Sequence, residues 1–315
     1  MGFLHHEPSH CLGADIAKDT IVFSDGPAGS VRTIANKRGA IRAFLKARGA
    51  DLIVCEPTGG HELVLLEACL AAGIACHRAD TLKLKSFIRS FGVLGKSDAI
   101  DAGMLAAYGR ERWKGLTLWR SPDADQLRLR SLVRRRSELV AMRVAEQNRA
   151  KAPGNSALTT SFRAIIVAIK RQILALDAAI KALVGEAPGL ARRATVCTAM
   201  NGIGPISAAA LIACLPELGS MSRRQAAALA GLAPHPSESG ARKGYRNIRG
   251  GRPEIRTILF MPALRAAAGN GEFAGFYKRL VTKGKKPSVA ITAVMRKIVI
   301  TLNARLRDDQ SPQSS

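Results

Sequence analysis

Short apolar runs and turn signals alternate over the first 115 residues of the chain. Three runs, CLGADI, TIVFS and SVRTI, follow one another across the turns AKD and DGPAG, which predicts a meander of short strands. Two further β-rich runs, DLIVCEP and GIACHRA, alternate with segments in which apolar residues recur at helical spacing. We therefore expect an α/β domain with a mixed sheet over residues 8–115. Its expected strands are 11–16, 20–24, 30–34, 51–57 and 73–79, and its expected helices are 36–48, 61–72, 81–90 and 98–112.

The pattern changes at about residue 121, where a Ser-Pro signal opens one long basic helix. The run APGN at 152–155 interrupts it, and a second helix over 159–185 places isoleucine and leucine residues at helical spacing. Two long helices around a tight break predict a helical hairpin or coiled-coil arm over 120–187. An ordinary helix pair packed on the body is the alternative, which we disfavour because the first helix is too charged to be buried.

Short helices punctuated by glycine and proline fill residues 189–308, a second, mainly helical domain. Within it, NGIGP at 201–205 resembles a helix-hairpin-helix turn, which can present backbone N–H groups to a phosphate. A plain tight turn between two helices is the alternative. The last run, RDDQSPQSS at 307–315, is expected to be disordered. The expected fold class is thus α/β plus α.

Charge is distributed very unevenly along this chain. The formal net charge is +24, of which residues 1–115 contribute +3 (15 basic and 12 acidic side chains) and residues 116–315 contribute +21 (33 and 12). A metabolic enzyme has no evident use for such a field, whereas a polyphosphate partner does. Nucleic acid is therefore the expected partner class.

Six cysteines form neither a CxxC pair nor a disulfide-scaffold pattern, and five of them lie in or beside apolar stretches. We expect small buried thiols in a reduced, intracellular setting rather than a metal site. The longest apolar stretch, 63–76, is broken by Glu67 and is too short for a membrane span, and the N-terminus does not read as a signal peptide. A cytoplasmic protein without a membrane partner is expected.

Four acidic residues of the first domain occupy positions at which an unpaired charge is costly. Asp15 lies inside the first predicted strand, and Glu56 ends the apolar run LIVC. Asp98 and Asp101 are three residues apart and share one side of a predicted helix. Four converging carboxylates would repel one another unless divalent cations, such as two Mg²⁺ ions, neutralised them. Taken singly, each acid could instead be structural, for example as a helix cap.

Three runs, LGADIAKDT, CEPTGGH and GKSDAIDAGMLA, resemble in this order the three blocks of the DEDD-type transposases of the 110 family of insertion sequences. The resemblance implies a RuvC-like N-terminal domain of the ribonuclease H fold. It places the family's catalytic, metal-binding Asp, Glu, Asp and Asp on Asp15, Glu56, Asp98 and Asp101. Ser97 stands where the family more often has Thr, a change that keeps the hydroxyl group.

A basic, glycine-rich loop follows the run AGLAP in the second domain. Between 241 and 256 there are six basic residues and one acidic residue, with Tyr245 among them, which suits close approach to a nucleic-acid backbone. A merely solvated basic face is the alternative. The cations that we expect to bind nucleic acid are Arg242, Lys243, Arg246, Arg249, Arg252 and Arg256.

This loop resembles the second signature of the same family, in which a Gly-Leu-x-Pro run precedes a Ser-Gly pair. In that family the serine is the nucleophile, and the matching position is Ser239, followed by Gly240. Ser237 is the nearby rival. The run GGRPEIR replaces the commoner Arg-Gly-Asn-x-x-Leu-Arg pattern, which weakens the match for Arg252 and Arg256, and QNRAKAPGN departs from the usual Asn-Arg-Leu continuation of the arm.

The resemblance implies a DNA recombinase that cuts and rejoins element ends and target DNA with a serine nucleophile and a Mg²⁺-binding acid cluster. It further implies composite sites built from different protomers, a homo-tetramer and an element-encoded bridge RNA. A RuvC-like nuclease such as a junction resolvase, and a non-catalytic basic nucleic-acid-binding protein, are the alternatives.

Overall fold

A computed structural model of the chain describes residues 3–92, 95, 97–121, 123–236, 238–239, 242–243 and 246–310. It divides into two compact units, residues 1–122 and 123–315.

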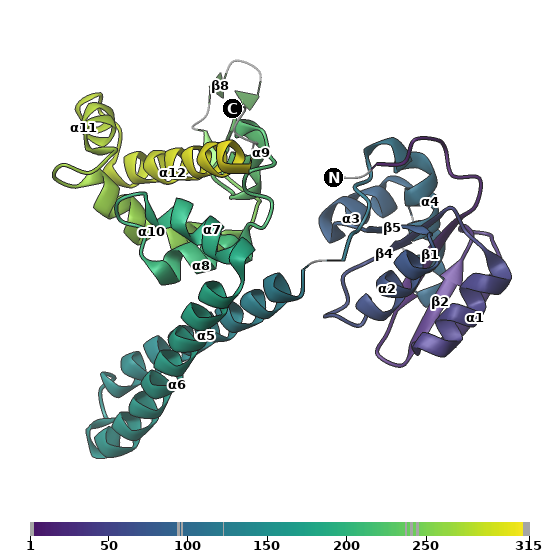
Figure 1. Cartoon of the computed structure of the whole chain (residues 1–315), viewed down its shortest axis with the longest axis horizontal. Helices are drawn as coiled ribbons and strands as arrows, with labels where there is room; N and C mark the ends of the chain where they lie inside the picture. The colour runs from purple at the N-terminus through teal and green to yellow at the C-terminus, as the bar shows by residue number, and fades with distance from the viewer. Residues whose placement is uncertain are drawn as a thin grey trace. The chain divides into compact units, whose positions relative to one another are not determined.

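The first unit is built on one five-stranded sheet in the order β3-β2-β1-β4-β5 (Figure 1). β2 pairs antiparallel with both β1 and β3, whereas β4 pairs parallel with β1, and β5 parallel with β4. This mixed sheet confirms the predicted α/β class and is compatible with a ribonuclease H-like domain. The strands are β1 (Cys11–Ile16), β2 (Thr20–Ser24), β3 (Val31–Ala35), β4 (Leu52–Cys55) and β5 (Ala75–Arg78).

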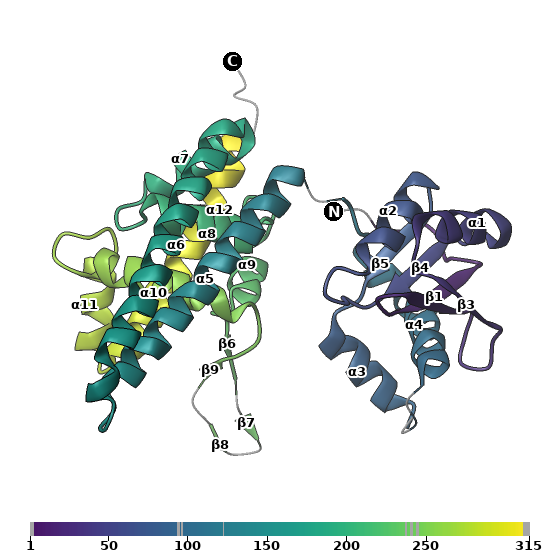
Figure 2. The ribbon, with the colours of Figure 1, turned by 90° about the horizontal axis from the view of Figure 1, so that it is seen from below.

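Helices cover both faces of this sheet because successive side chains of a strand point to opposite sides. Leu12, Ala14 and Ile16 face α1 and α2, while Cys11 on the same strand faces α3 and α4 (Figure 2). Each face therefore has its own apolar core, and Phe23 and Phe44 stack in the first of them. The helices are α1 (Arg38–Arg48), α2 (Leu63–Ala71), α3 (Thr81–Ser90) and α4 (Asp98–Arg112), followed by the short 3₁₀ helix η1 (Trp113–Gly115).

The second unit begins with a helical hairpin of α5 (Ala124–Ala150) and α6 (Thr159–Glu186), with the short 3₁₀ helix η2 (Ser156–Leu158) before α6. Toward the tip, Leu139 packs against Ile169 and Ile173, and the Arg136 guanidinium pairs with the Asp177 carboxylate across the seam. At the base, side chains of both helices join the core of the C-terminal helices. The hairpin thus shares a core with the rest of its unit instead of forming the separate segment 120–187 that the sequence suggests.

Six further helices pack around that shared core. α7 and α8 are joined through Gly202, whose φ is +95° and whose added Cβ would lie 3.1 Å from Arg265 Cβ on α10. Close packing against α10 therefore gives the NGIGP turn a structural reason. These helices are α7 (Pro188–Thr198), α8 (Pro205–Cys214), α9 (Arg223–Leu229), α10 (Pro253–Ala267), α11 (Ala274–Thr282) and α12 (Pro287–Gln310).

The predicted disorder of 307–315 is wrong for its first four residues, because α12 continues through Gln310. Arg192 on α7 holds this end with an ion pair to Asp309, with 2.7 Å between Nε and Oδ2. The remaining residues of the run, 311–315, lie outside the described part of the chain.

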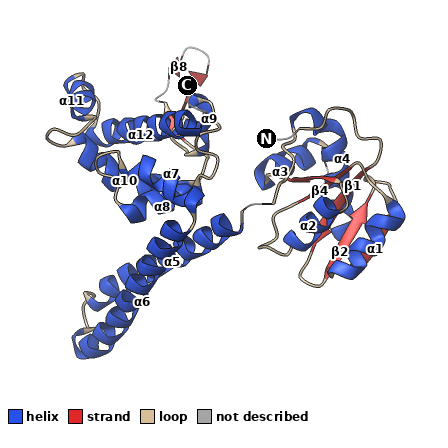
Figure 3. Ribbon diagram, viewed as in Figure 1, coloured by secondary structure: helices blue, strands red, loops and turns tan. Residues whose placement is uncertain are grey.

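Two small antiparallel ladders interrupt the helices of the second unit, and the sequence analysis, which expects only a loop there, misses them (Figure 3). β6 (Pro234–His235) pairs with β9 (Asn247–Ile248), and β7 (Glu238–Ser239) pairs with β8 (Arg242–Lys243).

The buried thiols are confirmed: five of the six cysteines are buried, Cys214 is partly buried, and all six are free. Within the described ranges, no helix is both long and apolar enough to span a bilayer.

Candidate functional site

Two of the predicted acids lie side by side at the end of neighbouring strands. In the parallel β1–β4 pair, Ala14 is opposite Cys55, so the next residue along each strand is Asp15 and Glu56. Side-chain alternation puts Asp15 on the same face as Cys11, and Glu56 on the same face as Val54. Both carboxylates therefore point to the face of the sheet that α3 and α4 cover.

Gly13 brings α4 against this face. A Cβ on Gly13 would lie 1.9 Å from the Ala102 carbonyl oxygen and 2.5 Å from the Ala106 nitrogen, so no larger residue fits. Two residues before Gly13 on the same strand, the Cys11 thiol donates to the Ala106 carbonyl oxygen at 3.5 Å. Going along β1 from Cys11 toward Asp15 thus leads toward the first turn of α4, the turn that carries the other two acids.

Asp98 and Asp101 lie in that first turn. Ser97 is the N-cap, since its hydroxyl accepts the Ile100 N–H at 3.3 Å. The capping role that Asp98 could have had is therefore filled by its neighbour.

The Asp15 carboxyl lies near other acids of this domain. Its pKa is raised from 3.8 to about 6, first because the carboxyl is partly buried and then because Asp101, Asp98 and Glu56 carry like charges nearby. The Glu56 Oε1 atom is buried and, among the described residues, has no hydrogen-bond partner. Crowded, partly dehydrated carboxylates with a spare oxygen lone pair are a donor set that fits a hard divalent cation such as Mg²⁺. Within the described ranges no three acidic, histidine or cysteine side chains stand close enough to hold a metal ion.

A fifth acid of this domain, Glu62, was missed by the sequence analysis. Its side chain is buried, at 2% exposure, directly before α2. Burial alone would raise its pKa, but hydrogen bonds from its own N–H and from Thr58 and Gly60, together with Arg78, hold the pKa below its usual value. The available signal was an acid two residues after a Gly-Gly turn, a position where a carboxylate can accept free N–H groups of the turn.

The proposed nucleophile belongs to the second unit. Ser239 lies in β7, directly opposite Arg242 in β8. The β6–β9 ladder is the stem that joins this β7–β8 ladder to the helices of the unit (Figure 2). Ser237, Gly240 and Tyr245 lie outside the described residues.

The two last cations of the loop hold its base. Arg252 binds the Glu217 carboxylate through both terminal nitrogens, at 2.7 and 2.8 Å, and also the Cys214 carbonyl at 2.7 Å. Arg256 donates to the Gly231 and Gly250 carbonyls at 3.3 and 3.1 Å. Both guanidinium groups are thus engaged within the domain.

Arg246 and Arg249, by contrast, are exposed, and Arg242 and Lys243 are placed by their backbone pairing with β7. Of the cations expected to bind nucleic acid, Arg246 and Arg249 are thus the ones with exposed side chains among those whose side chains the structure describes.

Glycine allows the loop base to close. Gly231 has a φ of +66°, and a Cβ on it would lie 2.4 Å from the Gly250 carbonyl oxygen. A Cβ on Gly251, whose φ is +63°, would lie 2.2 Å from the Gly231 nitrogen. The chain therefore leaves and re-enters the helical body at one point, with the serine ladders between.

Comparison with known proteins agrees with both motif sets. The profile of the IS110 DEDD transposases matches residues 12–159, and the profile described as transposase IS116/IS110/IS902 family matches residues 194–278. The pilin gene-inverting protein of Moraxella bovis is 27% identical over 263 residues, which cover 82% of this chain and 80% of that protein. An uncharacterized protein of insertion element IS116 from Streptomyces clavuligerus is 29% identical over 64% of this chain and 50% of its own length. An IS900 protein of Mycobacterium paratuberculosis is 27% identical over 88% of this chain and 75% of its own length. With one profile of this family on each unit, the chain belongs to the IS110 family of transposases.

Proposed function

We propose that this transposase cuts and rejoins DNA by transesterification, with the Ser239 hydroxyl as nucleophile and Asp15, Glu56, Asp98 and Asp101 as the ligands of Mg²⁺. The observation that supports the proposal is the placement of Asp15 and Glu56 next to each other in the β1–β4 pair, on the face of the sheet against which α4, the helix of Asp98 and Asp101, packs. Like charges this close favour protonation of one of them unless a cation binds between them. Bound Mg²⁺ would supply charge neutralisation at the attacked phosphate and at the leaving oxygen.

The serine conserves the energy of the bond that it breaks. Its Oγ forms a bond to phosphorus while the bond from phosphorus to the 3′ oxygen breaks, and the hydroxyl proton is passed on so that the 3′ oxygen leaves as a hydroxyl. Attack by a different 3′ hydroxyl on the phosphoserine then reverses the step and frees Ser239. No water enters the DNA backbone, so cutting and rejoining need no external energy source.

The cations around the serine are suited to the phosphate. Arg242 stands opposite Ser239 in the β7–β8 ladder, and Lys243 follows it. Arg246 and Arg249 are exposed near the stem. Positive charge at this place would offset the charge that grows on the phosphate oxygens during attack.

DNA is the partner that the family implies, and two further partners belong to the proposal. The net charge of +21 on residues 116–315 suits simultaneous contact with DNA and a bridge RNA. The name of the Moraxella bovis relative says that it inverts a pilin gene, a reaction that also requires cutting and rejoining. Because the acids and Ser239 lie on different units, we propose that a homo-oligomer, a tetramer, assembles composite sites from different protomers.

An assay for a covalent adduct tests the proposal. The full chain would be incubated with element-end DNA, candidate bridge RNA and Mg²⁺, and the products examined for DNA joined to protein. The wild type is expected to form the adduct, whereas Asp15→Asn and Asp98→Asn should form none while binding nucleic acid nearly as well. Free nicks without adduct would favour the nuclease alternative, and undiminished cleavage by either variant would contradict the acid assignment.

A further inference from the structure

The loop between β4 and α2 carries Glu56 at its start and Glu62 at its end. It turns through Gly59 and Gly60, whose φ angles of +64° and +109° few other residues adopt. The Glu62 carboxylate accepts the N–H groups of Thr58 and Gly60, each at 2.9 Å, through its Oε2 atom. One buried side chain therefore closes the loop that begins with a proposed metal ligand.

Thr58 extends this connection to Glu56 itself. Its hydroxyl donates to the Glu56 carbonyl oxygen at 3.3 Å, while its N–H is held by Glu62. The backbone on the C-terminal side of Glu56 is thus fixed within two residues of its Cα. Among the described residues the Oε1 atom of Glu56 has no hydrogen-bond partner that could orient the carboxylate, so its direction depends on the backbone that carries it. Glu62 fixes the backbone of the residues that follow Glu56.

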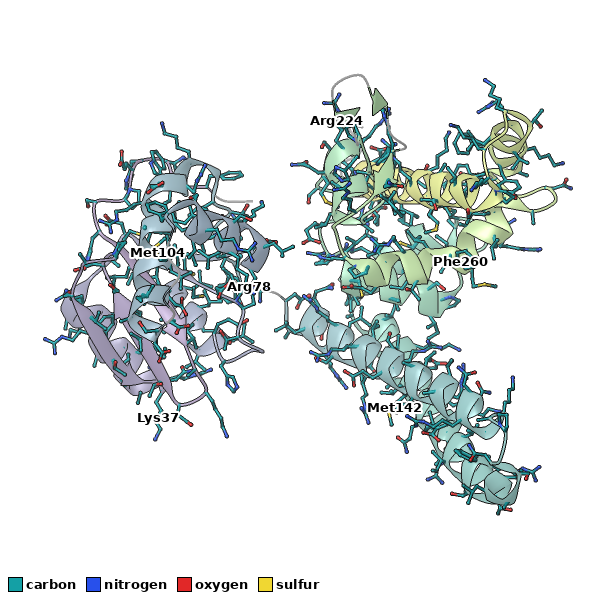
Figure 4. All side chains as sticks on the ribbon, turned by 180° about the vertical axis from the view of Figure 1, so that it is seen from behind. Lys37, Arg78, Met104, Met142, Arg224 and Phe260 are labelled. Atoms are coloured by element: carbon teal, nitrogen blue, oxygen red, sulfur yellow. The ribbon has the colours of Figure 1, made fainter. Side chains whose placement is uncertain are left out.

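Arg78 makes the burial of Glu62 tolerable. Its Nη1 lies 3.3 Å from Glu62 Oε1, the oxygen that the loop N–H groups leave free. Arg78, which Figure 4 labels, ends β5 opposite Cys55, so strand alternation puts it on the α1/α2 side of the sheet. The same alternation puts Glu56 on the opposite side. The Glu62–Arg78 pair therefore holds the loop from the α1/α2 side of the sheet and does not occupy the side on which Glu56 and Asp15 lie.

Asn36 ties the same loop to the strand of Asp15. Its Nδ2 donates to the His61 carbonyl at 3.2 Å and to the Ala17 carbonyl at 3.0 Å, the latter two residues after Asp15. The loop is thus fixed internally by Glu62 and externally to β1, the strand that presents the second carboxylate.

We propose that Glu62, charge-paired with Arg78, is a positioning residue that orients Glu56 toward Asp15 and thereby sets the affinity of the acid site for its divalent cation. The inference rests on the proposed function, since it assumes that Glu56 and Asp15 bind that cation. It goes beyond the four acids of the family motif by adding a fifth that does not touch the cation.

The test compares two glutamate-to-glutamine changes at positions that are five residues apart, Glu62 and Glu67. Glu62→Gln keeps shape and one acceptor but loses the charge that two N–H groups and Arg78 satisfy. Glu67→Gln is the matched control, because Glu67 lies on α2 in an exposed ion pair with Arg38, 48% exposed. Mn²⁺ affinity of the full chain is measured by titration calorimetry at a temperature at which all variants are folded. We expect Glu62→Gln to bind Mn²⁺ at least about tenfold more weakly, the scale typical of lost support for a metal ligand, and Glu67→Gln to bind within about twofold of wild type.

The metal dependence of cleavage distinguishes positioning from general destabilisation. Cleavage by Glu62→Gln should reach most of the wild-type maximal rate at high Mn²⁺, with a raised half-saturating Mn²⁺ concentration. A merely unstable protein would instead cleave more slowly than wild type at every Mn²⁺ concentration.

If Glu62→Gln does not fold, Arg78→Met and Arg78→Lys replace it, and only Arg78→Met should weaken Mn²⁺ binding. Wild-type Mn²⁺ affinity in Glu62→Gln, or in a folded Arg78→Met, overturns the inference. Asp15→Asn separates the two claims: if it leaves Mn²⁺ binding intact, the proposed function fails, and if it abolishes binding while Glu62→Gln does not weaken it, only this inference fails.

Discussion

At the scale of single residues, Asp15 is the group whose environment differs most from that of an ordinary surface carboxylate. It lies inside a strand, within reach of three other acids, and its pKa is raised to about 6. The neutral form of Asp15 therefore persists to a higher pH in the folded protein than in a free peptide. In the absence of a cation, the ionised form stores repulsion that binding of the cation releases.

The pH dependence of stability follows from this shift. The folded-state pKa of Asp15 is above its value of 3.8 in a free peptide, so ionisation destabilises the metal-free protein as pH rises from about 4 to about 6, and the full penalty is present above that range. In EDTA at pH 7.5, Asp15→Asn should raise the free energy of unfolding by about 1 kcal/mol, a value reduced because the group is half exposed, and the variant should therefore unfold at a higher temperature. The gain should fade by pH 4. Calorimetry at both pH values measures this gain in stability. Asp19→Asn is the control, because Asp19 is an exposed acid in the turn after the same strand. An equal gain of Asp15→Asn at both pH values would contradict the assignment.

At the scale of elements, the approach of α4 to β1 creates the acid site, and Gly13 permits that approach. An added Cβ at Gly13 meets the backbone of α4 at 1.9 Å, which cannot be relieved by turning a side chain. The helix would have to move away from the strand and take Asp98 and Asp101 with it.

Gly13→Ala should therefore lower the free energy of unfolding by about 3 kcal/mol or more, as overpacking does in a close-packed core, and should remove cleavage. Gly39→Ala is the control, since Gly39 lies in α1 with open space around its Cα and should be neutral or gain up to about 1 kcal/mol from helix propensity. Chemical denaturation measures both. Equal stability of the two variants would show that α4 does not pack on β1 as described.

The ion pair between Glu217 and Arg252 is the corresponding support for the serine loop. Its two short contacts join the region after α8 to the start of α10, directly below the serine ladders. Because the pair is only about a quarter exposed, removing one charge leaves the other poorly compensated.

We expect Glu217→Gln to reduce adduct formation at least tenfold while duplex DNA affinity falls less than about threefold, the change that roughly one lost phosphate contact could cause. The control is Glu272→Gln, which should react like wild type. Glu272 lies just before α11 and pairs with Arg305 on α12. A loss of affinity as large as the loss of adduct would assign Arg252 to DNA contact instead of loop support.

At the scale of the whole molecule, the excess positive charge is the dominant feature. If residues 116–315 contact many phosphates, log affinity for duplex DNA should fall with log salt with a slope of about −5 or steeper. Arg246→Ala combined with Arg249→Ala should make that slope shallower by about 2, whereas Lys37→Ala with Lys46→Ala on the first unit should change it less than half as much. A nearly flat salt dependence of the wild type would mean that the charge serves solubility.

Much of this molecule could be predicted from its sequence because local patterns and global fold agree. The strands and helices of the first unit follow from period-2 and period-3.6 patterns. The register that puts Asp15 beside Glu56 does not, because it depends on which residues of β1 and β4 pair. The ladders beside Ser239 could not be predicted, since two-residue strands leave no periodicity. The ion pairs of Glu62 with Arg78 and of Arg252 with Glu217 were also out of reach, because each joins residues that are distant in sequence and adjacent only in the fold.

The most direct test of the central claim is peptide mapping of the covalent DNA–protein adduct. After the reaction with Mg²⁺ is trapped and the protein digested, the residue that carries the phosphodiester is identified by mass spectrometry. Our account predicts the link on Ser239, with adduct and strand exchange lost together in Ser239→Ala and largely retained in Ser237→Ala. A link on Ser237, or on any residue outside 235–246, would contradict it.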